Sequence, residues 1–202
     1  MKDFLEALSS KEPTPGGGGA SALVAAVSCS LCSMVANLTT GKKKYAQYQE
    51  KIDEYLTVLE EKNILLQNDI KKDADAFAPL AAAYSMDKSA PDYEEHMEKA
   101  LYDAAKAPLE ILEDIYSLVP IIEDLAVMGS RLAISDVAVA AVCCKAALQG
   151  CSLNVFINTK SMKNDVVAGE FNDKVFTILK DSADRLDKVY NDISCGLIKI
   201  GE

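Results

Sequence analysis

The sequence contains no tryptophan and a single histidine, and no apolar segment with β-strand character is longer than Leu153–Ile157. Abundant alanine together with few aromatic residues favours closely packed helices over a sheet. The histidine, His96, lies in a charged stretch, and the cysteine pair with metal-ligand spacing, Cys29 and Cys32, lies inside an apolar one. A zinc site is therefore not expected, and the six cysteines are interpreted as small core residues of a protein in a reducing compartment.

Positive charge is also scarce, since 21 lysine and arginine residues face 31 aspartate and glutamate residues, for a net charge of −10. This balance argues against nucleic acid and anionic membrane surfaces as general partners. The first residues contain no long apolar stretch before a cleavage site, so we expect no signal peptide and a cytoplasmic location. Ala20–Leu38 approaches the length of a membrane span, but more than half of it is alanine, serine or cysteine, which favours a buried helix of a soluble bundle.

Helical periodicity dominates the remainder of the chain. The expected helices cover Lys2–Leu8, Ala20–Thr39, Lys44–Ser85, Pro91–Met128 with kinks at Pro108 and Pro120, Ser135–Gln149 capped by Gly150, and, after a loop at Cys151–Lys160, Asn164–Ile200. No repeat, low-complexity tract or linker divides these segments. We therefore expect an all-α fold, an up-and-down bundle of about five long helices in a single domain spanning residues 1–202.

A proline- and glycine-rich segment, Pro13–Gly19, runs directly into the apolar helix. Prolines cannot continue a helix, while the glycines let the backbone approach a ligand or another helix closely. A helix N-terminus also offers free N–H groups to an anionic or carbonyl-rich ligand, although a flexible connection into a buried helix is the alternative. A phosphate loop is excluded because no Gly-Lys-Ser/Thr follows, and a dinucleotide fingerprint is excluded because no strand precedes.

The apolar stripe of the helix expected over Lys44–Ser85 carries two polar residues, Asn63 and Asp73. Asp75 lies about 200° from Asp73 around the helix and is expected to face away. A carboxylate on an apolar stripe is unfavourable unless it is paired or used in function. A functional carboxylate and a salt bridge across the bundle, to Arg131 or a lysine, both remain open at Asp73.

Three further groups are candidates for function. Asp136 could be a catalytic carboxylate reaching into the bundle, although a first-turn acid with Ser135 as N-cap is the stronger interpretation from the residues alone. Lys42–Lys44 form the one basic cluster, which complements a helix C-terminus or attracts an anionic ligand. Asn154 and Asn158 supply amides that could recognise a heterocycle or cap turns.

Together these segments resemble the cyclodeaminase/cyclohydrolase family, which comprises the C-terminal domain of formiminotransferase-cyclodeaminase and stand-alone methenyltetrahydrofolate cyclohydrolases. The motifs that carry the resemblance stand in the family order and span almost the whole chain: Pro15–Gly18, Met34–Tyr45, Asp73–Phe77, Ile134–Asp136 and Asn154–Asn158. The chain departs from the family pattern at Gly129–Ala133, which leaves the substrate contacts around Arg131 open. The resemblance implies an all-helical bundle that forms a homodimer and acts on a tetrahydrofolate derivative.

The implied activity is that of a methenyltetrahydrofolate cyclohydrolase, which converts 5,10-methenyltetrahydrofolate and water to 10-formyltetrahydrofolate without a metal or further cofactor. The chain contains no formiminotransferase domain, which favours this activity. Asp73 would act as the base, Asp136 and Ser135 would orient water or pterin, and Lys43 would assist proton transfer or bind carboxylate. The substrate, expected to be polyglutamylated, would be held by Gly16, Gly17, Gly18, Gly19, Ser21, Lys42, Lys44, Asn154 and Asn158. A formiminotetrahydrofolate cyclodeaminase and a non-catalytic folate-binding module remain as alternatives.

Overall fold

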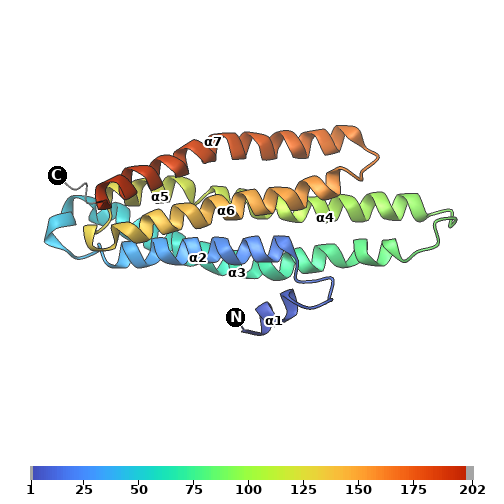
Figure 1. The fold of residues 1–202 in the computed structure, drawn as a ribbon, viewed down its shortest axis with the longest axis horizontal. Helices are drawn as coiled ribbons and strands as arrows, with labels where there is room; N and C mark the ends of the chain where they lie inside the picture. The colour runs from blue at the N-terminus through green and yellow to red at the C-terminus, as the bar shows by residue number, and fades with distance from the viewer. Residues whose placement is uncertain (1, 199–202) are drawn as a thin grey trace.

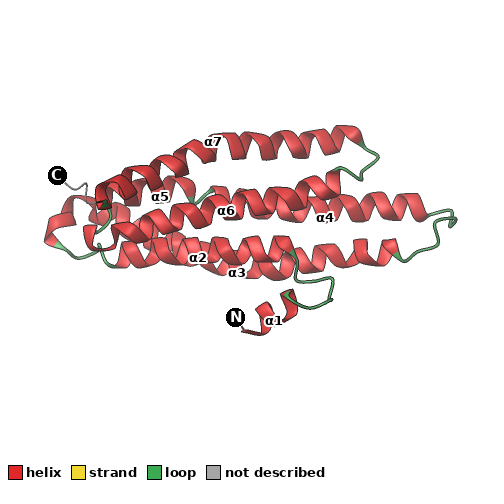
Figure 2. Ribbon diagram, viewed as in Figure 1, coloured by secondary structure: helices red, strands yellow, loops and turns green. Residues whose placement is uncertain are grey.

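The computed structural model describes residues 2–198, and over these residues the chain forms helices without any strand (Figure 2). The elements are α1 (Lys2–Leu8), α2 (Gly17–Asn37), η1 (Lys43–Tyr48), α3 (Gln49–Tyr84), α4 (Tyr93–Tyr116), α5 (Val119–Met128), η2 (Arg131–Ala133), α6 (Ile134–Thr159) and α7 (Asp165–Leu197). The long helices run side by side along one axis, and α1 lies outside them (Figure 1). The predicted all-α bundle is confirmed.

Helix α2 packs closely against both α3 and α6 because its buried positions hold small residues. Its serines find partners there, since Ser28 Oγ donates to the carbonyl of Ala140 in α6 at 2.8 Å. Helices α2 and α6 are antiparallel neighbours, and both are long and apolar enough to cross a membrane by length and composition alone. About half of each apolar segment is buried inside the bundle, 56% for α2 and 44% for the segment containing α6.

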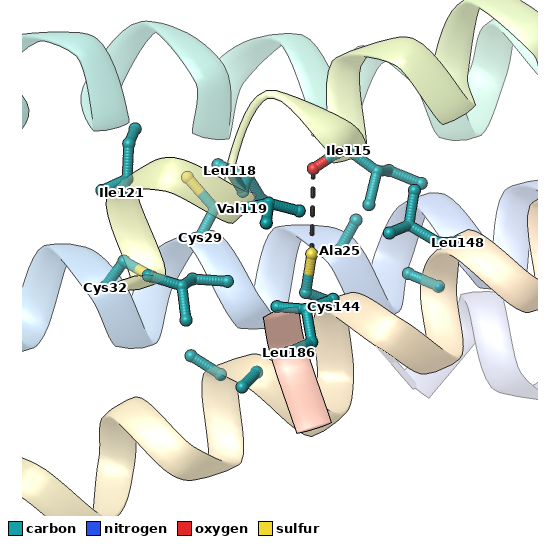
Figure 3. Packing of buried hydrophobic residues seen from close by; sticks show 14 of the residues in the cluster. Ala25, Cys29, Cys32, Ile115, Leu118, Val119, Ile121, Cys144, Leu148 and Leu186 are labelled. Atoms are coloured by element: carbon teal, nitrogen blue, oxygen red, sulfur yellow. Dashed lines mark hydrogen bonds between the residues drawn. The ribbon is translucent and has the colours of Figure 1, made fainter. Parts of the chain in front are cut away.

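Most of the cysteines are core residues, as predicted. Cys29, Cys32, Cys144 and Cys151 are buried, whereas Cys143 is half-buried and Cys195 is exposed. Figure 3 shows the Cys144 thiol directed at the carbonyl of Ile115 between apolar side chains. Burial raises the pKa of Cys29 to about 11 and that of Cys144 to about 12, so both remain thiols near neutral pH.

Several predicted boundaries are wrong. Helix α2 begins at Gly17 and not at Ala20, and α3 begins at Gln49 because Lys43–Tyr48 forms the 3-10 helix η1. The helix expected over Pro91–Met128 is two helices, because α4 ends at Tyr116 and Pro120 stands in the first turn of α5, where its missing N–H is tolerated. Helix α6 does not end at Gly150 but continues to Thr159, so the loop expected over Cys151–Lys160 is helical. The end expected at Ile200 lies outside the described residues.

Gly150 serves a helix contact instead of a helix end. A Cβ atom at this position would lie 2.6 Å from Ser21 Oγ of α2, which is too close for any side chain. The glycine therefore lets α2 and α6 approach each other, and the helix continues because nothing in its backbone is strained. This contact could not be read from α6 alone.

Different helices make up the two ends of the bundle. Helix α2 begins part-way along it, and α3 and α4 continue past that point (Figure 1). The main apolar cluster includes α2, whereas a second, smaller cluster is built by α3, α4 and the first turns of α7 around Leu80, Leu101 and Ala168. Beyond the N-terminus of α2, the space beside α3 and α4 is therefore covered by the loop that precedes α2 and not by a helix.

Candidate functional site

A pocket of about 220 Å³ lies at this position, between the loop that precedes α2 and helices α3, α4 and α6. It is lined by Pro13, Thr14, Gly16, Gly17, Asp73, Phe77, Ala104, Asn154, Ile157 and Asn158. Five of these residues, namely Gly16, Gly17, Asp73, Asn154 and Asn158, were candidates from sequence alone. We call this part of the molecule the pocket end; it includes the neighbouring Gly18 and Gly19.

Asp73 is the titratable side chain of the pocket. The Gly19 N–H donates to Asp73 Oδ2 at 2.9 Å, so the carboxylate is held at the N-terminus of α2. Burial raises the pKa of Asp73, and the bond from Gly19 opposes this shift. Within residues 2–198 no lysine, arginine or histidine lies within 4.0 Å of this carboxylate, so the cross-bundle salt bridge is absent there. Asp75 is exposed, as its place on the helix predicted, and contacts Lys71 at 2.5 Å.

The glycines make room for that carboxylate. A Cβ atom on Gly18 would lie 1.9 Å from Asp73 Oδ1, and a Cβ atom on Gly17 would lie 3.1 Å from Asn154 Oδ1. The N–H groups of Gly17 and Gly18 have no hydrogen-bond partner within the described part of the chain. The glycine run therefore brings the positive end of the α2 dipole against Asp73 and the pocket, as the motif suggested.

Asn154 and Asn158 reach the pocket from one face of α6 and not from a loop. Asn154 Nδ2 donates to the Gly150 carbonyl at 2.9 Å. Asn158 Nδ2 donates to the carbonyls of Ala104 at 2.8 Å and Asn154 at 2.9 Å. Their spacing of four residues, which was interpreted as part of a loop, places both amides on the same side of a helix.

Ser21 is close in sequence to the glycines but does not line the pocket. Its Oγ donates to the Gly17 carbonyl at 2.7 Å and lies against Gly150. The structure thus gives this predicted binding residue a packing role.

The remaining candidates gather at the opposite end of α2, which we call the basic end and define as Thr40–Tyr45 with the adjoining Gln49 and Asp53 and with Ser130–Asp136. Lys42 Nζ donates to Ser130 Oγ at 3.3 Å, and the Arg131 N–H donates to the hydroxyl of Tyr45 at 3.0 Å. Because α2 has 21 residues, this end lies about 30 Å from the pocket. One copy of the chain therefore does not bring Lys42, Lys43, Lys44, Ser135 or Asp136 to Asp73.

The capping role expected of Ser135 is wrong. Helix α6 begins at Ile134 with Ala133 as its N-cap and no side-chain cap, because the short helix η2 leads directly into it. Asp136 stands in the first turn of α6, which fits the interpretation as a first-turn acid.

Asp69 is a polar residue that sequence reasoning missed. It lies one helical turn before Asp73, is 1% exposed, and its Oδ2 has no hydrogen-bond partner among the described residues. Burial and the nearby Asp114 carboxylate raise its pKa to about 6, and Lys72, with Nζ 4.0 Å from Oδ1, opposes the shift. The spacing of four residues from Asp73 was the available signal, because residues at i and i+4 share a helix face.

Fold and site together define an all-helical bundle protein with a carboxylate pocket at the glycine-rich start of a central helix. The sequence matches the formiminotransferase-cyclodeaminase family over residues 1–176, and the chain belongs to this family.

Among its relatives, the methenyltetrahydrofolate cyclohydrolase of Methylorubrum extorquens is 30% identical over 197 residues, which cover 96% of this chain and 95% of the relative. The rat formimidoyltransferase-cyclodeaminase is 26% identical over 186 residues, which cover 90% of this chain and 34% of that longer protein. The crystal structure of a formiminotetrahydrofolate cyclodeaminase from Thermotoga maritima superposes with a TM-score of 0.82 at 30% identity, covering 96% of this chain and 92% of that one.

Proposed function

We propose that this chain is a methenyltetrahydrofolate cyclohydrolase with its reaction centre in the pocket. The Methylorubrum relative supports this proposal, since the two proteins match over nearly their full lengths. The observation that carries it is Asp73, a largely buried carboxylate that faces a pocket at a helix N-terminus and has no cationic partner among residues 2–198. Such a group suits a substrate that is itself a cation.

The proposed reaction uses acid–base groups alone. The bridging carbon of 5,10-methenyltetrahydrofolate is an electrophilic amidinium centre, which the Asp73 carboxylate balances electrostatically. Asp73 accepts a proton from the attacking water as the new C–O bond forms. The carbon–N5 bond then breaks as N5 takes the proton held by Asp73, and the hydroxyl of the adduct loses its proton to solvent to become the formyl carbonyl, so one proton is released overall. The formyl group remains on N10. Burial moves the pKa of Asp73 upward, toward neutral pH, and a general base is most effective when its pKa lies near the pH at which it works.

A formiminotetrahydrofolate cyclodeaminase is the second candidate, supported by the name and TM-score of the Thermotoga structure. That reaction closes the same ring with loss of ammonia. The same carboxylate would balance the charge of the cationic product and carry a proton. The pocket is therefore compatible both with attack of water on the bridging carbon and with closure of the ring at that carbon.

We also propose a homodimer formed through the neighbouring helices α2 and α6. Helix α2 carries no charged residue, and its exposed side includes Val27 and Met34, followed by the exposed C-cap residue Leu38. The exposed row of α6 runs from Val139 to Ile157, which also lines the pocket. A monomer seldom leaves such an uncharged apolar surface open. An antiparallel pair would place the basic end of one chain beside the pocket of its partner.

The basic end would then receive the acidic tail of the substrate. Lys42–Lys44 are the cationic cluster of an otherwise acidic chain, and a polyglutamate tail carries several carboxylates. We propose a cytoplasmic protein that requires no cofactor beyond the folate and binds neither nucleic acid nor membrane. The free thiols of its cysteines support a reducing compartment.

Direct assay of both reactions on the purified protein tests the proposal. The protein should accelerate the loss of methenyltetrahydrofolate absorbance over buffer, with and without a metal chelator. No acceleration, together with rapid ammonia release from formiminotetrahydrofolate, would move the assignment to the cyclodeaminase. Folate binding without activity in either assay would identify a binding module.

A further inference from the structure

A proline inside α4 leaves one backbone carbonyl without its helical partner. Pro108 has no N–H, so the Ala104 carbonyl, four residues earlier, cannot accept the usual intrahelical hydrogen bond. The carbonyl is not left unsatisfied, because Asn158 Nδ2 of α6 donates to it at 2.8 Å. Asn158 is 8% exposed, so this bond forms in the interior beside the pocket.

The same amide nitrogen makes a second bond, to the Asn154 carbonyl at 2.9 Å. An amide nitrogen has two donors, and here both are directed at carbonyl oxygens, which only accept. Rotating the amide by 180° would place Asn158 Oδ1 against those two oxygens and break both bonds. The orientation of Asn158 is therefore determined by chemistry, and its Oδ1 is left without a protein donor in residues 2–198.

Asn154 repeats the arrangement one turn earlier. Its Nδ2 donates to the Gly150 carbonyl, and its amide lies against Gly17 at the pocket, where a Cβ atom would be 3.1 Å from Oδ1 and 3.2 Å from Nδ2. The pocket therefore offers the amide oxygens of Asn154 and Asn158 and the carboxylate of Asp73, all of which accept hydrogen bonds. Phe77 and Ile157 line the same space with apolar surface.

A pocket with this pattern matches the edge of a flat heterocycle that carries adjacent N–H groups. We propose that Pro108 is a positioning residue that holds the Asn158 amide oxygen toward the pocket, where it and Asn154 Oδ1 accept hydrogen bonds from the 2-amino-4-oxopyrimidine edge of the substrate. The proposal rests on the folate activity proposed above and adds the substrate edge, the atoms that read it and the residue that orients them.

The variant Pro108→Ala tests whether the missing N–H at position 108 sets the orientation of Asn158. Alanine restores the N–H at position 108, which competes with Asn158 for the Ala104 carbonyl and frees the amide to turn. We expect KM for methenyltetrahydrofolate to rise about tenfold, the effect of losing one oriented hydrogen bond, with kcat within about twofold of the parent. The matched control is Pro79→Ala in α3, where no side chain in the described part of the chain donates to the carbonyl of Asp75, and there KM should not change.

A specificity measurement separates orientation from simple loosening of the pocket. The parent protein should bind a 2-amino-4-oxopteridine about tenfold more tightly than the analogue without the 2-amino group. Pro108→Ala should lose most of this preference, whereas Pro79→Ala should keep it. Equal preference in the parent and Pro108→Ala would overturn the proposal, as would a parent that binds neither pteridine.

Thermal unfolding provides a readout that does not depend on activity. Asn158→Ala should lower the melting temperature in the parent, because it leaves the Ala104 carbonyl buried and unpaired. The same substitution should have a much smaller effect in a Pro108→Ala background, where the restored N–H satisfies that carbonyl. Equal losses in the two backgrounds would contradict the proposed link between Pro108 and Asn158. If the link holds but neither folate reaction is catalysed, the proposed activity fails while the orientation of Asn158 stands.

Discussion

The two ends of α2 hold similar kinds of polar residue but use them differently. At the basic end the polar groups are paired with one another: Asp53 Oδ1 accepts hydrogen bonds from Gln49 at 2.8 Å and Thr40 at 2.9 Å, and these bonds lower its pKa. At the pocket end Asp73 receives a bond from Gly19 and its pKa is raised by burial. The pocket is therefore distinguished by a carboxylate whose pKa burial raises and that has no cationic partner among the described residues, and not by polar content alone.

Glycine shows the same contrast. Gly41 at the basic end has a φ of 72°, a left-handed conformation that ends the turn after α2, and nothing would meet a Cβ atom there. At the pocket end Gly18 has an ordinary backbone, and its missing side chain is what admits the Asp73 carboxylate. Gly41 is needed for its backbone conformation, whereas Gly18 is needed because a side chain there would occupy the place of the Asp73 carboxylate.

The largest expected effect is that of Asp73→Asn, which keeps the shape of the side chain but removes the base. We expect turnover to fall roughly 100-fold or more, as for loss of a general base, with thermal stability unchanged or higher. Steady-state kinetics on the folded variant provide the measurement. Asp75→Asn, on the exposed side of the same helix, is the control and should be nearly silent. A damaging Asp75→Asn beside a silent Asp73→Asn would show that the site is built on the wrong carboxylate.

Asp69→Asn tests whether the buried Asp69 carboxylate, whose Oδ2 has no hydrogen-bond partner among the described residues, weakens the fold. Its folded-state pKa of about 6 exceeds its usual value of 3.8, so the folded protein binds this proton more tightly than the unfolded chain does. Stability therefore falls as pH rises from about 4 to about 6, and the loss persists above that range. We expect Asn to raise the free energy of unfolding by about 2 kcal/mol at pH 8 and by little at pH 3.5.

Urea unfolding at the two pH values measures this difference, with Asp75→Asn as the exposed control. If Asp69→Asn were instead less stable than the parent at pH 8, Asp69 would be paired in solution, as Asp53 is at the basic end.

Gly18→Ala tests the packing of the pocket without changing any charge. The added Cβ atom must displace the Asp73 carboxylate, because the two would otherwise be 1.9 Å apart. Overpacking of this kind costs about 1–3 kcal/mol, and we expect catalytic efficiency to fall about tenfold. Gly169→Ala in α7 is the control, since no atom lies within 4 Å of a Cβ atom at that position and the residue does not line the pocket. If the two variants had equal activity, Asp73 would not need its present position.

The smallest effects are expected for the basic end. If Lys42 and Lys44 attract a polyglutamate tail, alanine at either position should raise KM for polyglutamylated substrate a few-fold, about 1 kcal/mol or less, and leave monoglutamate substrate unchanged. Added salt should shrink the difference, because it screens exposed charges. Kinetics with both substrates at low and high salt make the comparison. Identical effects on both substrates at every salt concentration would contradict binding of the tail. The lysines would then only complement the dipole at the C-terminus of α2.

Several parts of the site could be predicted because they depend on local spacing. The inward position of Asp73 and the outward position of Asp75 follow from helical periodicity, and the glycines before α2 indicate a close approach of the backbone. Asn154 and Asn158 were expected in a loop because Gly150 resembles a helix end. The contact of Gly150 with Ser21 involves residues far apart in sequence, and no local pattern contains it.

The sequence by itself determined the all-helical class, the order of the long helices and the register of Asp73, because periodicity and helix propensity act over a few turns of chain. Only the tertiary structure decided which polar residues meet. It separated Lys42–Lys44 and Asp136 from Asp73 by the length of α2, since the two groups stand at opposite ends of one rigid helix. It also brought the carbonyl freed by Pro108 to Asn158, because hydrogen-bond satisfaction is settled between helices that the chain places side by side.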